Sequence, residues 1–220
     1  MDSSSPEASR PRASTCAPRV VRAAEVAPQP WRNGGGKTRE LIAWPSVADW
    51  ALRISLADIH GDGPFSAFTG VQRWFAVIEG AGVALAFAEG ERIVRPGDAP
   101  LGFDGASAPG CRLLAGPTRD LNLMARGGHA ALRNVERGVA WREGFAQRGL
   151  FTAVPGRWRC GDSSRHLDAQ TLLWAEEPIG ASDAAWRFDA DDESAALLGW
   201  WLGYTPSASP LRDALSSPSA

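Results

Sequence analysis

The sequence predicts an all-β protein built as a sandwich or a barrel. Three observations support this fold class: short segments in which large apolar residues alternate with smaller or polar ones, glycine-rich turns between them, and a scarcity of long amphipathic helices. The clearest alternation lies at residues 50–56, and a period of two is typical of a half-buried strand. Many short strands joined by such turns are typical of sandwiches and barrels.

The individual elements follow from the same pattern. In the first half of the chain, strands are expected at residues 38–45, 50–56, 71–78, 83–87, 92–94, 111–115 and 121–124. Turns are expected at residues 79–82, 88–91 and 96–98, where glycine interrupts the apolar runs. In the second half, strands are expected at residues 150–154, 170–175, 185–188 and 197–202, with one short helical candidate between Pro178 and Trp186.

Composition narrows the class of protein. The chain has 220 residues, 44% of them hydrophobic and 22% charged, which suits one large or two small globular domains. A net charge of -2 gives no bulk attraction to nucleic acid or to an anionic membrane, and no apolar run could span a bilayer. The three cysteines are far apart and lack metal-ligand spacing, as expected of reduced thiols in a cytoplasmic protein.

Both ends of the chain have a different composition from the middle. Residues 1–18 are rich in Ser, Pro, Ala and Arg and lack the apolar core of a secretory signal. Residues 205–220 have a similar Ser, Pro and Ala character. We expect a disordered extension at residues 1–18 and a disordered tail at residues 205–220.

A run of three glycines, Asn33-Gly34-Gly35-Gly36-Lys37-Thr38-Arg39, first suggests a phosphate-binding loop. The nucleotide motif would need glycine where Trp31 stands, and a helix where a segment ending at Pro45 follows. Two interpretations remain. The glycines form a turn between strands, or their backbone N–H groups, with Lys37 and Arg39, hold a carboxylate or phosphate without hydrolysis. The second is favoured.

Several segments in order give the chain its strongest resemblance. They are the glycine loop with its flanks at residues 31–41, then residues 50–59, 63–68, 70–74, 77–80, 96–100 and 116–124. Together they closely resemble the HutD/Ves family, with dense matches from about residue 31 to residue 124. The second half matches mainly in length and strand character.

The resemblance implies a fold and a class of function. The fold would be a cupin-like double-stranded β-helix, or jelly-roll barrel, with two halves in one chain (a bicupin) at residues 19–125 and 126–204. Family members are cytoplasmic, some are associated with histidine utilisation operons and others with stress responses, and no secure enzymatic activity is attached to them. The histidine-linked members are thought to bind a small acidic intermediate, such as formylglutamate, and to moderate pathway flux. The resemblance is also compatible with a homodimer.

The sequence offers no evident metal site, cofactor site or catalytic set. His60, His129 and His166 are isolated, and the closely spaced histidines of metal-binding cupins are missing. Ser66 lacks the flanking glycines of a nucleophile elbow. We therefore predict no metal, no cofactor and no catalytic residue.

A pocket for a small anion is predicted instead. The alternation at residues 50–56 places Arg53 and Ser55 on one face, either lining the pocket or lying exposed on the sheet. Arg73 either binds ligand or pairs with Asp58 or Asp98 as a structural strut. The predicted ligand-binding residues are Lys37, Thr38, Arg39, Arg53, Ser55, Phe65, Ser66, Arg73 and Asn122.

Three functional hypotheses remain open at this point. The first is a metal-independent cupin that binds a small anionic metabolite and regulates histidine utilisation or a stress response. The second is a cupin enzyme with a metal site that the sequence does not reveal. The third is a structural or protein-interaction bicupin with a filled barrel.

Overall fold

The structure is a computed structural model that describes residues 18–176 and 184–207. Within these residues nearly all regular structure is β-strand, interrupted by two short 3₁₀ helices, η1 (Ala23–Glu25) and η2 (Gly105–Ser107). The all-β prediction is confirmed. No helix among these residues is long and apolar enough to cross a membrane.

The N-terminal half contains two sheets. The inner N-terminal sheet has the order β2-β3-β4-β11-β6-β9, formed by β2 (Gln29–Pro30), β3 (Gly36–Pro45), β4 (Trp50–Ile59), β11 (Thr118–Ala125), β6 (Gln72–Glu79) and β9 (Leu101–Asp104). The outer N-terminal sheet has the order β5-β10-β7-β8, formed by β5 (Gly63–Pro64), β10 (Gly110–Leu113), β7 (Val83–Phe87) and β8 (Gly90–Val94).

The C-terminal half also contains two sheets. The inner C-terminal sheet has the order β1-β16-β13-β18-β12, formed by β1 (Arg19–Arg22), β16 (Thr171–Glu176), β13 (Gln147–Thr152), β18 (Gly199–Thr205) and β12 (His129–Asn134). The outer C-terminal sheet has the order β15-β14-β17, formed by β15 (Ser163–Leu167), β14 (Gly156–Cys160) and β17 (Trp186–Ala190).

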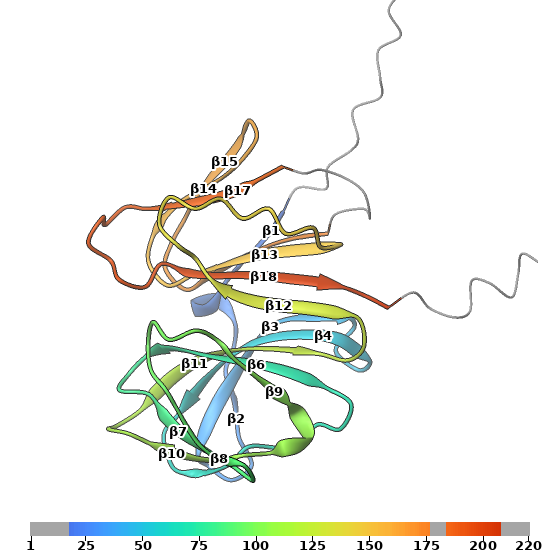
Figure 1. Ribbon diagram of the computed structural model, residues 1–220, viewed down its shortest axis with the longest axis vertical. Coiled ribbons are helices and arrows are strands. Elements are labelled where there is room, and N and C mark those ends of the chain that lie inside the picture. The colour runs from blue at the N-terminus through green and yellow to red at the C-terminus, as the bar shows by residue number, and fades with distance from the viewer. Residues whose placement is uncertain (1–17, 177–183, 208–220) are drawn as a thin grey trace, which may run out of the picture.

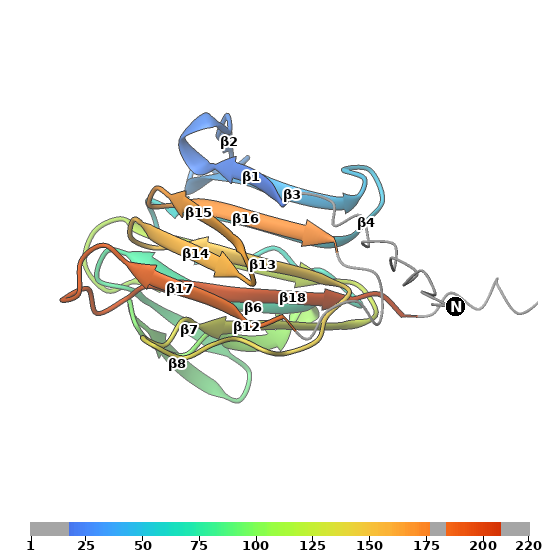
Figure 2. The same ribbon diagram turned by 90° about the horizontal axis from the view of Figure 1, so that it is seen from above.

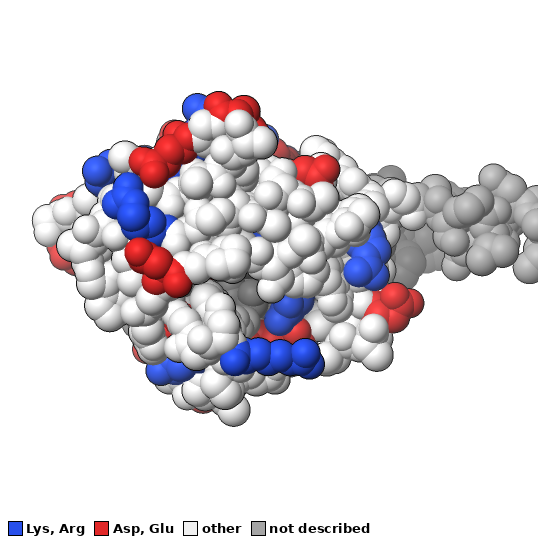
Figure 3. Space-filling view, turned by 90° about the horizontal axis from the view of Figure 1, so that it is seen from below, with Lys and Arg blue, Asp and Glu red and all other residues white. Residues whose placement is uncertain are grey.

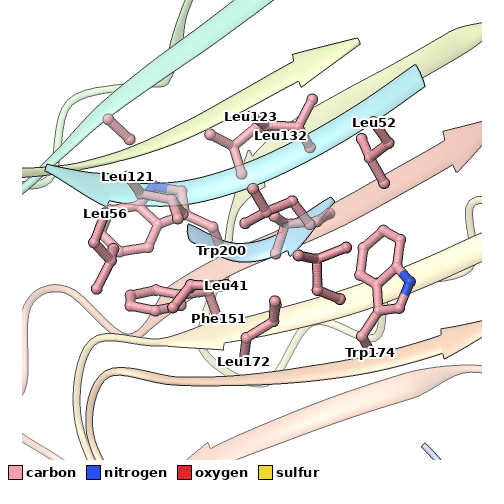
Figure 4. Close-up of a cluster of buried hydrophobic side chains, with 14 of the residues drawn as sticks. Leu41, Leu52, Leu56, Leu121, Leu123, Leu132, Phe151, Leu172, Trp174 and Trp200 are labelled. Carbon is pink, nitrogen blue, oxygen red and sulfur yellow. The ribbon is translucent and has the colours of Figure 1, made fainter. Parts of the chain in front are cut away.

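The four sheets stack in layers, with the two inner sheets facing each other in the middle (Figure 1). A large apolar cluster fills the space between the inner sheets and includes Leu56, Leu121, Phe151 and Trp200 (Figure 4). Each half has a second cluster between its own inner and outer sheets. Burying one face of each inner sheet against the other leaves the opposite faces to line two separate barrel interiors.

The two halves repeat the same strand pairings. In the N-terminal half β6 lies between β9 and β11, and β7 lies between β8 and β10. In the C-terminal half β13 lies between β16 and β18, and β14 lies between β15 and β17. The sequence shows no evident repeat, so this duplication is a property of the topology.

The first described strand crosses between the halves. β1 pairs along its whole length with β16, and the two lie side by side in Figure 2. The predicted division placed residue 19 onwards in the N-terminal half, whereas residues 19–22 belong to the inner C-terminal sheet. This pairing covers the edge of β16, which would otherwise present unpaired backbone groups.

Most predicted strands are found, several of them with longer bounds. The segment predicted at residues 50–56 is the ten-residue strand Trp50–Ile59, and the one predicted at residues 121–124 is Thr118–Ala125. The helical candidate between Pro178 and Trp186 lies mostly outside the described residues. The predicted extension and tail also lie almost entirely outside them, although Thr205 still ends β18.

Candidate functional site

The N-terminal barrel contains a cavity of about 470 Å³. Its lining residues come from β3, β4, β6 and β11 of the inner N-terminal sheet, from β2 and the loop that follows it, and from β5 and the segment that follows it. The face of the molecule seen from below is mostly uncharged and is hollowed near the middle, with basic and acidic side chains beside the hollow (Figure 3). The cavity is lined by Gln29, Pro30, Trp31, Arg32, Asn33, Thr38, Arg53, Ser55, Ala57, Pro64, Phe65, Ser66, Phe68, Arg73, Asp120, Asn122 and Met124.

Strand alternation decides which side chains reach the cavity. In β4, Leu56 and its alternate neighbours pack into the central core, so Arg53 and Ser55 point into the barrel. In β11, Leu121 packs into the central core while Asn122 lines the cavity. Because successive side chains of a strand point to opposite faces, the apolar set seals the core and the polar set lines the barrel.

Arg73 is the main cation of the cavity. It lies in β6, is only 6% exposed, and donates from Nη2 to Asn122 Oδ1 at 2.9 Å. Its guanidinium carbon lies 5.0 Å from the ring centre of Phe65, 5.8 Å from that of Phe68 and 5.1 Å from that of Phe103. Among the residues that the structure describes, Nε and Nη1 have no hydrogen-bond partner. Burial lowers the pKa of Arg73 to about 10, so the group remains a cation at neutral pH.

Asp120 lies beside this arginine on β11. Asn122 donates from Nδ2 to Asp120 Oδ1, which completes a chain from Arg73 through the amide to the carboxyl. Oδ2 has no partner within the described part of the chain, and the residue is fully buried. Burial raises the pKa of Asp120 well above its usual value, although the nearby charge of Arg73 opposes the rise.

Two further polar side chains of the cavity are held by neighbours. Arg53 donates from Nε to Glu40 Oε2 at 2.7 Å, and its side chain is 23% exposed. Thr38 accepts at Oγ1 from the indole N–H of Trp31 at 2.7 Å. Arg53 therefore faces the barrel with its charge already paired, which answers the open question of which face it occupies.

Lys37 and Arg39 lie on the other face of β3, away from the cavity. Both contact Asp58: Arg39 Nη1 lies 2.7 Å from its carboxylate and Lys37 Nζ lies 3.7 Å from it. Arg119 Nε approaches the same carboxylate at 2.5 Å. Burial raises the pKa of Asp58, but hydrogen bonds from Arg119 and Arg39 outweigh it and the pKa is lowered. The structure thus separates these two predicted ligand residues from Thr38, which sits between them in sequence.

The model of one protein family, described as HutD, matches residues 23–198. The chain belongs to the HutD family. Protein Ves from Citrobacter koseri is 34% identical over 185 residues, which cover 80% of this chain and 91% of that protein. An uncharacterised 21.2 kDa protein in the hutC 3′ region of Pseudomonas putida is 38% identical over 109 residues, covering 48% of this chain and 56% of that protein.

Solved structures agree with this assignment. HutD from Pseudomonas fluorescens SBW25 superposes with a TM-score of 0.75 at 28% identity, covering 87% of this chain and all of that one (100%). An oxalate decarboxylase variant from Bacillus subtilis superposes with a TM-score of 0.53 at 10% identity, covering 94% of this chain and 83% of the other. At that identity the second match shows only a shared fold. The predicted HutD/Ves membership and the cupin-like double-barrel fold are both confirmed.

The glycine loop of this HutD family member is a tight turn. Gly34 N donates to Trp31 O at 3.0 Å, and Gly35 N donates to the side chain of Asn33 at 3.0 Å. A Cβ on Gly36 would lie 2.5 Å from Asp58 O and 3.0 Å from the Trp31 ring. Because two of the three glycine N–H groups already have partners inside the loop, the structure favours the turn interpretation over an anion cradle.

The three histidines of this HutD family member lie in separate surroundings. His60 is exposed, His129 stacks on Phe145 with ring centres 5.2 Å apart, and His166 Nε2 lies 2.8 Å from Asp191. Across the described residues, no group of three or more His, Cys, Asp or Glu side chains is placed to hold a metal ion.

Of the predicted ligand-binding residues, seven meet at one cavity: Thr38, Arg53, Ser55, Phe65, Ser66, Arg73 and Asn122. Sequence reasoning missed Asp120 and Phe103. The alternation Asp120-Leu121-Asn122-Leu123 carried the signal for Asp120, because it places the carboxyl on the same face as Asn122. Phe103 lies beside Arg73 because β9 pairs with β6, and no local sequence pattern predicts this pairing.

Proposed function

We propose that the N-terminal barrel binds a small anionic metabolite whose carboxylate pairs with Arg73. The observation that carries this proposal is a buried guanidinium that lines a cavity and keeps Nε and Nη1 without partners among the described residues. A buried donor without a partner costs about 1–3 kcal/mol, more when it is charged, so a ligand oxygen would relieve a penalty that folding leaves in place. Adjacent guanidinium donors match a carboxylate in a two-bond geometry.

The aromatic rings around Arg73 would shape the site. Phe65 and Phe68 belong to the segment that follows β5, and both rings lie against the guanidinium. Nε and Nη1 of Arg73 lack solvent contact. A ligand would therefore reach them after the rings of Phe65 and Phe68 rotate away. The rings then supply the apolar wall of a typical small-molecule site.

The names of the relatives support the biological role that we propose. The P. putida relative lies beside hutC, and the matched family and solved structure are named HutD. These names support a role in regulating histidine utilisation, carried out in the cytoplasm by binding an acidic intermediate such as formylglutamate. A stress response, which the resemblance to the HutD/Ves family also implies, is the second proposed setting for the same binding activity.

Calorimetric titration with N-formyl-L-glutamate, urocanate and glutarate tests the proposal. We expect heat of binding for at least one acid, and a loss of about 2 kcal/mol or more of binding free energy in Arg73→Gln. The matched control is Arg112→Gln, which removes an exposed arginine of the outer N-terminal sheet that pairs with Glu91. The control should bind as the wild type does.

Two results would count against this function. Absence of heat with all three acids, from a protein whose unfolding transition is intact, would exclude the histidine-pathway version. Equal affinity in the wild type and Arg73→Gln would make Arg73 a structural residue.

A further inference from the structure

We propose that the pocket takes up its anionic ligand together with one proton, which resides on the carboxyl of Asp120. This inference rests on the proposed function, since it concerns how the same pocket accepts an anion. It assigns to Asp120 the role of a hydrogen-bond donor to the ligand, in place of an acceptor.

The geometry places Asp120 beside any carboxylate that reaches Arg73. Both side chains are hydrogen-bonded to the single side chain of Asn122, Arg73 to its oxygen and Asp120 to its nitrogen. Asp120 is fully buried and lines the cavity, and within the described residues its Oδ2 has no partner. Oδ1 is held by Asn122, so the second oxygen is the atom left for the ligand.

Charge determines which form of Asp120 suits an anion. Two carboxylates that share a buried site repel each other, and one of them is driven to the protonated form. A protonated carboxyl instead donates an O–H to the ligand, while Arg73 supplies the positive charge. Burial already raises the pKa of Asp120 in the unliganded protein, and a bound anion would raise it further.

The neighbouring ionisable groups come from several elements. Arg73 on β6 remains a cation, because its pKa is about 10. Burial, with a contribution from Asp120 and Asp62, raises the pKa of Cys111 on β10 to about 12, so this thiol stays neutral. Among the described residues, Arg53 on β4 and Arg32 also line the cavity. Asp58 on β4 and Arg119 on β11 act from further away and are hydrogen-bonded to each other. Asp58 lies on the opposite face of the sheet, where it is paired with three cations.

Proton uptake can be measured directly with the wild-type protein. N-formyl-L-glutamate and glutarate are suitable probes, since their carboxylates stay ionised above about pH 6. Each acid is titrated in two buffers with different heats of ionisation at each of a series of pH values, and the uptake is read above the pKa of unliganded Asp120, where its carboxyl is ionised before the ligand binds. The dependence of the observed heat on the buffer should correspond to an uptake of about one proton, and Kd should rise by up to about tenfold per pH unit above the pKa of unliganded Asp120.

Two variants assign the proton to a residue. Asp120→Asn keeps the shape and a donor group without a titrating proton, so it should bind with no proton uptake and no rise of Kd with pH. Cys111→Ala removes the nearby thiol and should keep the uptake. If Asp120→Asn does not fold, the wild-type heats still decide whether binding is proton-linked.

The failures are distinguishable. Binding of either acid without proton uptake at every pH of the series overturns this inference and leaves the proposed function standing. Uptake that persists in Asp120→Asn also overturns it. Absence of binding by these two acids and by urocanate at every pH overturns the histidine-pathway version of the proposed function, and this inference with it.

Discussion

The two halves of the molecule carry a buried arginine at the same place and use it differently. Arg73 is the second residue of β6 and Arg148 is the second residue of β13, its topological counterpart. Arg148 lies 4.7 Å from the ring centre of Trp141 and 4.8 Å from that of Trp186, and donates to the backbone oxygens of Ala184 and Trp141 at 3.1 and 3.3 Å. The guanidinium of Arg148 is thus held by contacts within the C-terminal barrel, whereas the guanidinium of Arg73 faces a cavity.

The residue across the ladder from each arginine helps to explain the difference. Arg148 is opposite Gly203, where an added Cβ would lie 2.2 Å from the ring of Phe145. Arg73 is opposite Met124, which lines the cavity. Because Gly203 has no Cβ, the ring of Phe145 can lie inside the C-terminal barrel. The same fold therefore yields a filled barrel and a hollow one, according to where aromatic rings are placed.

The largest expected effect is a loss of unfolding free energy when a ring is removed from the filled C-terminal barrel. Trp186 is 1% exposed, and its ring packs against those of Trp141, Trp158 and Trp201. Trp186→Ala should lower the free energy of unfolding by about 3–5 kcal/mol, because a large aromatic group leaves a cavity that its neighbours cannot refill. Phe68→Ala, at the half-buried wall of the N-terminal cavity, should cost about 1 kcal/mol or less.

Urea unfolding followed by tryptophan fluorescence measures both changes. Because Trp186→Ala removes a fluorophore, circular dichroism at the same urea concentrations is the check. Similar losses of unfolding free energy in the two variants would mean that Phe68 stabilises the N-terminal barrel as much as Trp186 stabilises the C-terminal one. The two barrels would then not differ in how tightly they are packed.

A second, smaller contrast separates the two arginines. Arg148→Met removes the donor to the backbone oxygens of Trp141 and Ala184 and should lower the free energy of unfolding by about 2–4 kcal/mol. Arg73→Met removes a desolvated cation, and only the side-chain oxygen of Asn122 loses a hydrogen-bond donor. We therefore expect the free energy of unfolding to change by about 1 kcal/mol or less.

The measurement is again the urea midpoint, with thermal unfolding as a second probe. An equal loss in the two methionine variants would show that Arg73 supports the fold as Arg148 does. Its place in the ligand site would then need another explanation.

The sequence alone predicted much of the fold but only part of the site. Alternation at residues 50–56 correctly separated Arg53 and Ser55 from the core leucines. The same rule, applied to β3, would have shown that Lys37 and Thr38 point to opposite faces, but it could not say which face was the barrel. The answer depends on Asp58, which gathers Lys37 and Arg39 on the far side of the sheet.

The partners of Arg73 show where sequence reasoning stops. Asp58 and Asp98 were the predicted struts, yet Asp58 pairs with Arg39 and Arg119, and Asp98 accepts from the backbone of Arg95. The actual partner, Asn122, is brought beside Arg73 by the pairing of β6 with β11, although the two residues are 49 positions apart in the sequence. Such register is set by non-local pairing and by a bulge at Arg119, neither of which a local pattern specifies.

The smallest expected effect concerns the pH dependence of stability in the hollow barrel. The folded-state pKa of Asp120 is raised above its ordinary value of 3.8, so the unfolded chain releases this proton first as the pH rises. The folded state then binds more protons than the unfolded one, and the free energy of unfolding falls by up to about 1.4 kcal/mol per pH unit between 3.8 and the folded-state pKa. Asp120→Asn removes the titrating group, so the difference in unfolding free energy between this variant and the wild type should grow in favour of the variant as the pH rises through that window.

Urea unfolding of both proteins at a series of pH values measures the difference, with Asp189→Asn on the exposed edge of the C-terminal half as the control. A difference that stays constant with pH would mean that Asp120 is ionised in the folded protein, and the hollow barrel would then hold a charge pair with Arg73 in place of a net positive charge.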